Sequence, residues 1–274
     1  MKALRATMAV LLLLAATEAP GSDMGPSGVA YPSGPTVPEN LLRIELRFSA
    51  PLQTPLSIDH IKLFDVNGLE IEHPFLDLPL PSADSKRVTI LFHPGRVKTG
   101  VRANLAFGRA LHAGSVVTLV VDDPALAQPV RKTWQVTAFD AESPQPGQWA
   151  FEPPRRGSRD PLVVHLDAPI SSSAEGLIAI RGPDGGRLAG TARLEEGESV
   201  WRFVPARPWG ARSHAVVTHQ DLEDPAGNRP CAPFEVIDAS RVRCEGGTVQ
   251  PFEPRAARAI RATAASHTGS VRPR

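Results

Sequence analysis

The chain repeats one order of strand-like runs and turns, and this repeat restricts its possible folds more than any other feature. In the first copy Pro51 follows an alternating run and Gly68 closes a later polar turn; in the second, Pro169 and Gly185 do the same at nearly equal spacing. The sequence therefore predicts two domains of one architecture. The matched runs are Leu42–Phe48 with Leu162–Leu166, Ile61–Leu63 with Ile178–Ile180, Ile90–Phe92 with Trp201–Phe203, Val116–Val121 with Ala215–Thr218, and Trp134–Val136 with Phe234–Val236.

The pattern within these runs is that of strands. Over Leu42–Phe48 apolar residues alternate with charged ones, and a period of two buries one face of a strand and leaves the other in water. Val116–Val121 is continuously apolar but for one threonine, as expected of a strand covered on both faces. The 28 prolines and 22 glycines disfavour long helices. About seven short strands per unit predict an all-β fold of two tandem immunoglobulin-like β-sandwiches.

Composition divides the chain into six segments. Residues 1–21 are predicted to be a signal peptide, because Lys2 and Arg5 precede the apolar run Met8–Ala16, with cleavage before Ser22. An uncleaved membrane anchor is the alternative, but the run is short for a bilayer, and no transmembrane span is expected in the mature chain. The remaining segments are a flexible linker over 22–37, a first sandwich over 38–138, a linker over 139–147, a second sandwich over 148–240, and a disordered basic tail over 241–274.

The signal peptide predicts a secreted or periplasmic protein. In that oxidising setting Cys231 and Cys244 are expected either to form a disulfide or to remain two unpaired thiols. Thirty basic and 29 acidic side chains leave a net charge of +1, so no nucleic-acid partner is predicted.

Several short motifs resemble those of bacterial Ig-like domains, such as the domains of S-layer and other secreted proteins. The most specific are Trp201-x-Phe203-x-Pro205 and the turn from Asp224 to Gly227-Asn228. The likeness is clearest over 149–236 and weaker over 38–136, where Asp122-Asp123-Pro124-Ala125 lacks the Gly-Asn pair. The resemblance implies a β-sandwich that serves as a spacer or binding module outside the cytoplasm, without a shared active site.

Three carboxylates, Asp221, Glu223 and Asp224, gather in one turn. Carboxylate oxygens at this spacing are candidate calcium ligands, but we favour an Asx-turn in which Asp224 or Asn228 caps its own backbone. His214 and His219 are five positions apart, and an odd separation on a strand places them on opposite faces, away from a shared metal. No cofactor is expected.

Two further groups of side chains are candidates for binding. Trp209, in a Pro-Trp-Gly turn, is the tryptophan expected to be exposed and available to a sugar, whereas Trp201 is expected in the core. Arg155, Arg156 and Arg159, together with the arginines of the tail, are candidates for contact with lipopolysaccharide, wall polymer or membrane. Solvated loops are the alternative for these arginines.

The sequence contains no Gly-x-Ser-x-Gly, no Gly-x-Gly-x-x-Gly, no Walker-type loop and no Cys-x-x-Cys. We therefore expect a non-catalytic secreted or cell-envelope Ig-like protein that acts as a structural spacer or protein-binding module. Its expected partner is an envelope or extracellular protein or a surface polymer. The alternative is an extracytoplasmic ligand-binding protein, for carbohydrate or a metal ion, that uses one end of a sandwich.

Overall fold

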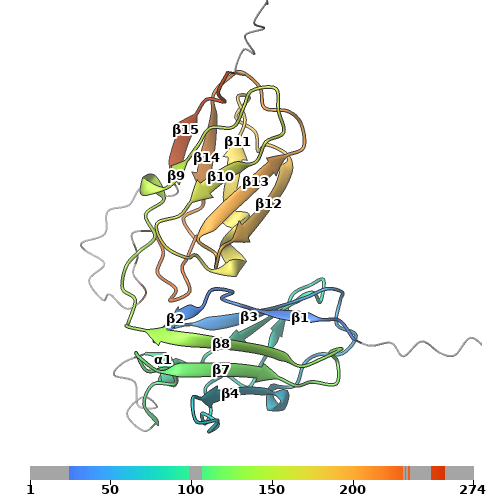
Figure 1. The fold of residues 1–274 in the computed structure, drawn as a ribbon, viewed down its shortest axis with the longest axis vertical. Coiled ribbons are helices and arrows are strands. Elements are labelled where there is room, and N and C mark those ends of the chain that lie inside the picture. The colour runs from blue at the N-terminus through green and yellow to red at the C-terminus, as the bar shows by residue number, and fades with distance from the viewer. Residues whose placement is uncertain (1–24, 99–106, 231, 233, 235–247, 257–274) are drawn as a thin grey trace, which may run out of the picture.

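A computed structural model describes residues 25–98, 107–230, 232, 234 and 248–256. Two β-sandwiches follow one another along the long axis of the molecule (Figure 1). The predicted signal peptide and both cysteines, Cys231 and Cys244, lie outside the described residues, so these expectations stay predictions. In the described part of the chain, no helix combines the length and the hydrophobicity needed to cross a membrane.

The first sandwich has two sheets of four strands. One sheet has the order β1-β3-β6-β5 and the other β2-β8-β7-β4; every pair is antiparallel except β2 with β8. The strands are β1 Gly28–Tyr31, β2 Thr36–Pro38, β3 Arg43–Phe48, β4 Ile61–Asp65, β5 Leu80–Pro81, β6 Arg87–Leu91, β7 Val116–Val121 and β8 Val130–Thr137.

The second sandwich pairs a four-stranded sheet, β12-β13-β10-β9, with a three-stranded sheet, β11-β14-β15. All of its strand pairs are antiparallel. The strands are β9 Ala150–Phe151, β10 Leu162–His165, β11 Ile178–Arg181, β12 Gly190–Glu195, β13 Val200–Pro205, β14 His214–Thr218 and β15 Val249–Phe252.

Both strand orders are immunoglobulin-like. In each sandwich one sheet has the order A-B-E-D and the other contains C-F-G. In the first sandwich β2 adds an A′ strand beside the last strand, β8. The predicted fold class, all-β with two tandem immunoglobulin-like sandwiches, is confirmed by this strand order.

Each sandwich closes over its own apolar core. In the first, Ile44, Leu63 and Trp134 are almost completely buried. In the second, Trp201 is fully buried and its ring stacks on Phe203 at 5.7 Å between centroids. The in-phase apolar positions predicted from the alternation are therefore core positions, because they face the opposite sheet.

The helical segments whose bounds lie within the described residues are short, as the proline and glycine content predicted. They are the 3₁₀ turns η1 Ile58–His60, η2 Pro146–Gln148 and η3 Ser172–Leu177, and the single-turn α1 Pro94–Val97. The predicted Asn-Gly turn also forms: Gly68 has a φ of +78°, and Asp65 accepts hydrogen bonds from the N–H groups of Asn67 and Leu69 at 2.9 and 2.8 Å. After this turn the chain runs back beside β4, where Phe64 and Glu70 form a single antiparallel β-bridge.

The prediction of a flexible linker over 22–37 was wrong for its described part. Residues 28–31 form β1 and residues 36–38 form β2. The prolines that suggested a linker, Pro32 and Pro35, lie between the two strands, where the chain leaves one sheet and enters the other. Gly28 is required by packing, because a Cβ there would lie 2.8 Å from Val130 and 3.0 Å from Phe48.

The boundary of the second sandwich at 240 was also wrong. Its last strand is β15 at Val249–Phe252, inside the predicted tail, and Phe234, assigned to that strand from the sequence, lies in a turn. Phe252 is buried against Phe151 and Trp209, which fixes β15 in the core. The connection between β14 and β15 is far longer than that between β7 and β8, so spacing in the first copy pointed to the wrong residues.

Candidate functional site

The most elaborate polar site in the described residues is the contact between the two sandwiches, which we call the joint. Figure 1 shows the lower end of the second sandwich resting on the part of the first that carries β1, β2 and β3. The joint is formed by the outer face of β3, the β1–β2 connection, η3, the β12–β13 turn and the loop after β14. None of these elements was predicted to meet another sandwich.

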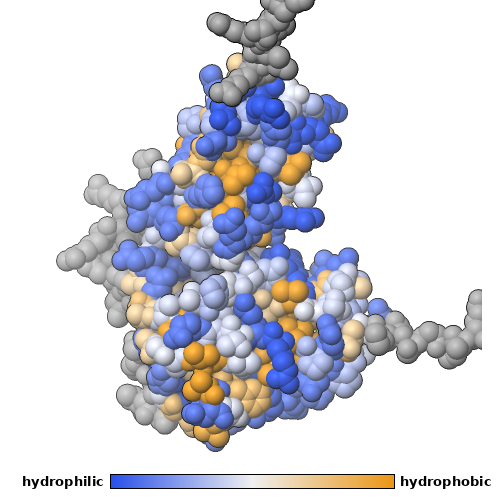
Figure 2. Space-filling model, viewed as in Figure 1, coloured by the Kyte–Doolittle hydropathy of each residue, from blue (hydrophilic) through white to orange (hydrophobic). Residues whose placement is uncertain are grey.

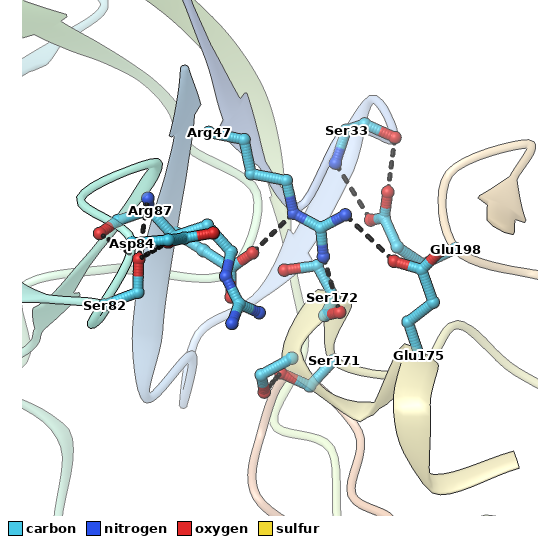
Figure 3. Close-up of polar contacts among 11 residues, drawn as sticks. Ser33, Arg47, Ser82, Asp84, Arg87, Ser171, Ser172, Glu175 and Glu198 are labelled. Carbon is cyan, nitrogen blue, oxygen red and sulfur yellow. Dashed lines mark hydrogen bonds and ion pairs between the residues drawn. The ribbon is translucent and has the colours of Figure 1, made fainter. Parts of the chain in front are cut away.

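The alternating charges of β3 supply the first half of the joint. Arg43, Glu45 and Arg47 occupy the face that the alternation assigned to water, yet Glu45 is only 4% exposed. The Arg47 guanidinium binds Glu45 at 2.6 Å through Nε and donates to Glu175 Oε2 at 3.0 Å and to the Ser172 carbonyl at 2.7 Å (Figure 3). One arginine therefore links its own strand to two residues of η3, with the planar geometry that guanidinium groups favour.

Glu198 supplies a second link. It lies in the β12–β13 turn, is 1% exposed, and its carboxylate accepts hydrogen bonds from both the N–H and the hydroxyl of Ser33 (Figure 3). Lys132 in turn donates to the Ser33 carbonyl. Burial raises the pKa of the Glu198 carboxyl above its ordinary value, although the Ser33 hydrogen bonds and the charges of Arg47 and Lys132 act in the opposite direction.

The loop after β14 forms the third part of the joint. Its Glu223 pairs with Arg43, and its Pro225 carbonyl accepts from the N–H of Leu42 at 3.1 Å. The predicted interdomain linker is held from both sides, because the Asp140 carbonyl accepts from Asn40 at 2.8 Å and from Asn228 at 3.1 Å. The loop is thus bonded to the first sandwich and to the linker.

Asp224 fixes the shape of this loop. Its carboxylate accepts from the backbone N–H of Asn228 at 2.9 Å and from the Asn228 side chain at 2.8 Å, while it is itself 2% exposed. Burial, together with the charge of Asp140 and against the Asn228 hydrogen bonds, raises the pKa of Asp224 to about 7. Gly227, with a φ of +84°, lies against Leu42. The Asp-to-Asn motif of the sequence therefore builds the loop that meets the first sandwich.

A small cleft of about 220 Å³ opens beside these contacts. Proline has a fixed φ, so walls rich in proline are stiff and support one relative placement of the sandwiches. The prolines lining the cleft are Pro32, Pro35, Pro38, Pro169 and Pro225.

The three calcium candidates bond to arginines or to their own loop, although Asp221 and Glu223 share Arg229. Asp221 binds Arg229 at 3.0 Å, Glu223 binds Arg43 across the joint, and Asp224 caps its own loop as the favoured Asx-turn required. Among the residues described, no group of three or more His, Cys, Asp or Glu side chains is arranged to hold a metal ion.

The tryptophan expected at the surface is buried. Trp209 is 2% exposed and its Nε1 donates to the Asp160 carbonyl at 2.8 Å, because the loop that carries it folds back over the end of the core. Trp201 is in the core as predicted. His214 is buried beside the Trp209 ring and burial lowers its pKa, whereas His219 lies beyond the end of β14 and is exposed.

The three arginines singled out from the sequence lie together at the end of the second sandwich remote from the joint. Arg155 pairs with Asp160 at 2.6 Å, and Arg159 donates to the Pro205 carbonyl at 3.0 Å. The backbone N–H of Arg156 donates to the Arg255 carbonyl at 2.8 Å. All three side chains are exposed.

Sequence reasoning missed Ser33, Arg47, Glu175 and Glu198, which carry the joint. Ser33 fell in an apparent linker, and isolated glutamates in turns have an ordinary explanation in solvation. The alternation over β3 placed Arg47 on a polar face but gave no sign that another sandwich covers that face.

The chain matches no protein-family model and no curated protein sequence. Solved structures with some similarity include a chimeric titin Z1Z2 carrying a peptide from decorin, at 11% identity over 85% of this chain and 97% of that chain, with a TM-score of 0.27. A tandem of Ig domains from titin (12% identity, 78% and 87% covered, TM-score 0.25) and murine CEACAM1b (12%, 85% and 100%, TM-score 0.22) are similar to the same degree. TM-scores this low do not support a structural relationship to these proteins. The immunoglobulin-like fold is assigned from the strand order.

Proposed function

We propose that this chain is a non-catalytic Ig-like module of the cell envelope or extracellular space, in which two sandwiches held at one angle act as a spacer or present a protein-binding surface. The observation that supports this proposal most is the joint. Arg47 bonds to η3, Glu198 bonds to Ser33, and the loop at Asp224 reaches the first sandwich through the Glu223–Arg43 ion pair and the Pro225 carbonyl. Contacts from three different segments of the second sandwich restrict motion between the domains.

The nature of these contacts also favours a fixed geometry. Charge-assisted hydrogen bonds to arginine depend strongly on direction. Glu198 is almost fully buried in the joint, and separating the sandwiches would take away its partner Ser33. Separation would also break the bonds from Arg47 to Glu175 and to the Ser172 carbonyl. A linker that served only as a flexible tether would not need buried carboxylates on either side.

The extracytoplasmic location is part of the same proposal and depends on the signal peptide predicted over residues 1–21. The partner class, an envelope or extracellular protein, follows from that location and from the use of sandwiches as spacers and binding modules in the family that the motifs resemble. The alternative function, carbohydrate or metal binding at one end of a sandwich, has less support, since Trp209 lies in the core.

Small-angle X-ray scattering tests the fixed angle. The wild-type chain is expected to give one narrow distribution of interdomain distances, whereas a double variant, Arg43→Ala with Arg47→Ala, gives a broad one. Lys86→Ala with Arg131→Ala is the matched control, because it removes the same charge from exposed positions of the first sandwich. A broad distribution in the wild-type chain contradicts the proposal.

Capture experiments from envelope fractions test the binding role. A partner that recognises both sandwiches in one arrangement is retained by the wild-type chain and by the control variant, and is lost from the Arg43/Arg47 variant although both of its sandwiches stay folded. Equal retention by all three chains would show that the joint does not matter for binding.

A further inference from the structure

The second sandwich separates its charges by end. Strand register places four loops together at the end remote from the joint. There β10 begins at Leu162, paired with Phe203 near the end of β13, and β12 begins at Gly190, paired with Pro205. In the other sheet, β14 begins and β15 ends at His214 paired with Phe252. Backbone hydrogen bonds tie these loops to one another, including one from Trp209 to Ser158 at 2.9 Å. We call this surface the distal end; it comprises residues 152–161, 181–189, 205–213 and 253–256.

The distal end is rich in arginine. It carries eight arginines and no lysine, against four acidic residues, and every one of the arginines is exposed. Only two of them form ion pairs with described residues, Arg155 with Asp160 and Arg255 with Glu152. The eight are Arg155, Arg156, Arg159, Arg181, Arg187, Arg207, Arg212 and Arg255.

The end that meets the first sandwich has the opposite composition. Over residues 166–177, 195–199 and 219–229 it carries eight acidic residues and one arginine, and it docks on the arginines of β3. The same sandwich therefore uses charge to hold a partner at one end and presents an unmatched positive surface at the other. The acidic residues are Asp167, Glu175, Glu195, Glu196, Glu198, Asp221, Glu223 and Asp224.

The sequence after Ala256 is also rich in arginine. Residues 257–274, which lie outside the described residues, contain four more arginines and no acidic residue. The net charge of the whole protein is only +1, so the positive charge is concentrated rather than general. Figure 2 shows hydrophilic residues over the upper end of the second sandwich.

We propose that the distal end docks on a bilayer surface through the phosphates of anionic lipid headgroups. Arginine binds phosphate through two parallel hydrogen bonds, which favours it over lysine at such surfaces. Loops from both sheets end at this surface, so several phosphates of a planar array can be contacted together. The large exposed hydrophobic residues, such as Val66 and Leu69, lie elsewhere, so docking depends on charge and not on insertion of side chains.

Vesicle flotation with the full chain tests this proposal. The wild-type protein is expected to float with phosphatidylcholine vesicles that contain phosphatidylglycerol, and to float far less with phosphatidylcholine alone. The second condition accounts for any contribution of the apolar N-terminal segment. Added salt weakens the difference, since exposed charges are screened.

A triple variant, Arg156→Ala with Arg207→Ala and Arg212→Ala, removes exposed arginines that have no ion-pair partner among the described residues. Each surface cation contributes about a factor of five to partitioning, so the variant partitions about 100-fold more weakly. Lys86→Ala with Arg87→Ala and Arg131→Ala is the matched control, with the same change in net charge on the first sandwich. It binds like the wild type.

Three results would overturn the proposal. The distal variant could bind as well as the wild type, both variants could lose binding equally, or inorganic phosphate at millimolar concentration could release the protein from vesicles. The last result would indicate a site for a single phosphate instead of a surface. Circular dichroism and thermal unfolding of both variants separate loss of binding from loss of fold.

Discussion

The carboxylate of Glu198 accepts two hydrogen bonds from Ser33, one from its N–H at 2.9 Å and one from its hydroxyl, although 165 positions separate the two residues. Ser33 lies between the first two strands of one sandwich, and Glu198 lies in a turn of the other. This pair joins the start of the folded chain to its second half. Its energetic value can be measured directly.

Glu198→Ala leaves the Ser33 N–H without its acceptor in the joint. A fully buried hydrogen-bonding group without a partner costs about 1–3 kcal/mol. Because Ser33 is half-buried, we expect a loss of about 1 kcal/mol in the free energy of unfolding, measured with urea. Glu198→Gln costs less, because its amide oxygen still accepts from Ser33. A double-mutant cycle with Ser33→Ala is expected to show coupling; strictly additive losses would mean that the two side chains do not interact.

Arg47→Ala leaves Glu45 buried without its counter-charge. Removing one partner of a buried ion pair costs about 3 kcal/mol, and the same substitution frees η3 from the first sandwich. Arg47→Lys recovers little of this loss, because an ammonium group cannot replace the planar donors that reach Glu45, Glu175 and the Ser172 carbonyl together. Arg131→Ala, at an exposed position, is the control. If Arg47→Lys were as stable as the wild type, the three bonds of the guanidinium group would not be what stabilises this contact.

Asp224 makes the stability of the protein depend on pH. Burial raises its folded pKa from 3.8 to about 7, so the folded state holds the proton more tightly than the unfolded state. Its contribution is therefore complete below the unfolded pKa and is lost as the pH rises toward 7. Asp224→Asn has no proton to lose at this position. We therefore expect the free energy of unfolding of the wild type, relative to that of the variant, to fall by up to about 4 kcal/mol as the pH rises from about 4 to about 7.

Urea unfolding at a series of pH values measures this difference. The variant also alters one hydrogen bond to Asn228, which shifts its stability by a similar amount at every pH and leaves the slope unaffected. Glu198 changes stability in the same direction, since its pKa is also raised. A difference that grew with rising pH would contradict the assignment.

Gly227→Ala combines two costs at the joint. A φ of +84° is unfavourable for alanine, and its Cβ would lie 2.2 Å from Leu42 Cδ1. We expect a loss of about 2 kcal/mol and a weaker joint in scattering experiments. Gly210→Ala is the control, because a Cβ there meets nothing within 4 Å and the backbone does not need glycine. If both variants lost a similar amount of stability, Gly227 would have no particular importance for the joint.

The sequence predicted the sandwiches better than their contact. Alternation over β3 identified core positions such as Ile44 and Leu46, because burial follows the two-residue period. The continuous run of β7 was expected to be covered on both faces, but Val116 and Thr118 are only half-buried. The same alternation could not show that the polar face of β3 is covered, since charge that faces water and charge that faces a complementary surface look alike in one chain. β12 was not identified, because its residues are half exposed and lack a clear period.

The joint could not be predicted because its residues come from remote parts of the chain. Ser33, Arg47 and Glu198 are adjacent only after both sandwiches have formed. The Asp224 loop was recognised as a capped turn, but a turn motif gives no direction for the loop that it builds. The exposure of Trp209 was misjudged for a related reason, since local turn residues do not reveal a loop that folds back over a core.

The bonds made by Asp140 have a practical consequence for work on the separate halves of this protein. The segment between the sandwiches is tied to Asn40 on one side and to Asn228 on the other. If the chain were divided at this segment, the carboxylates of the second half would lose the arginines of β3. In the first half, the charged face of β3 would become exposed to solvent. Separate fragments would therefore lack the contacts that the intact molecule makes between its sandwiches. An unrelated domain of the same architecture could not replace either half, because it would not carry the residues that form these contacts.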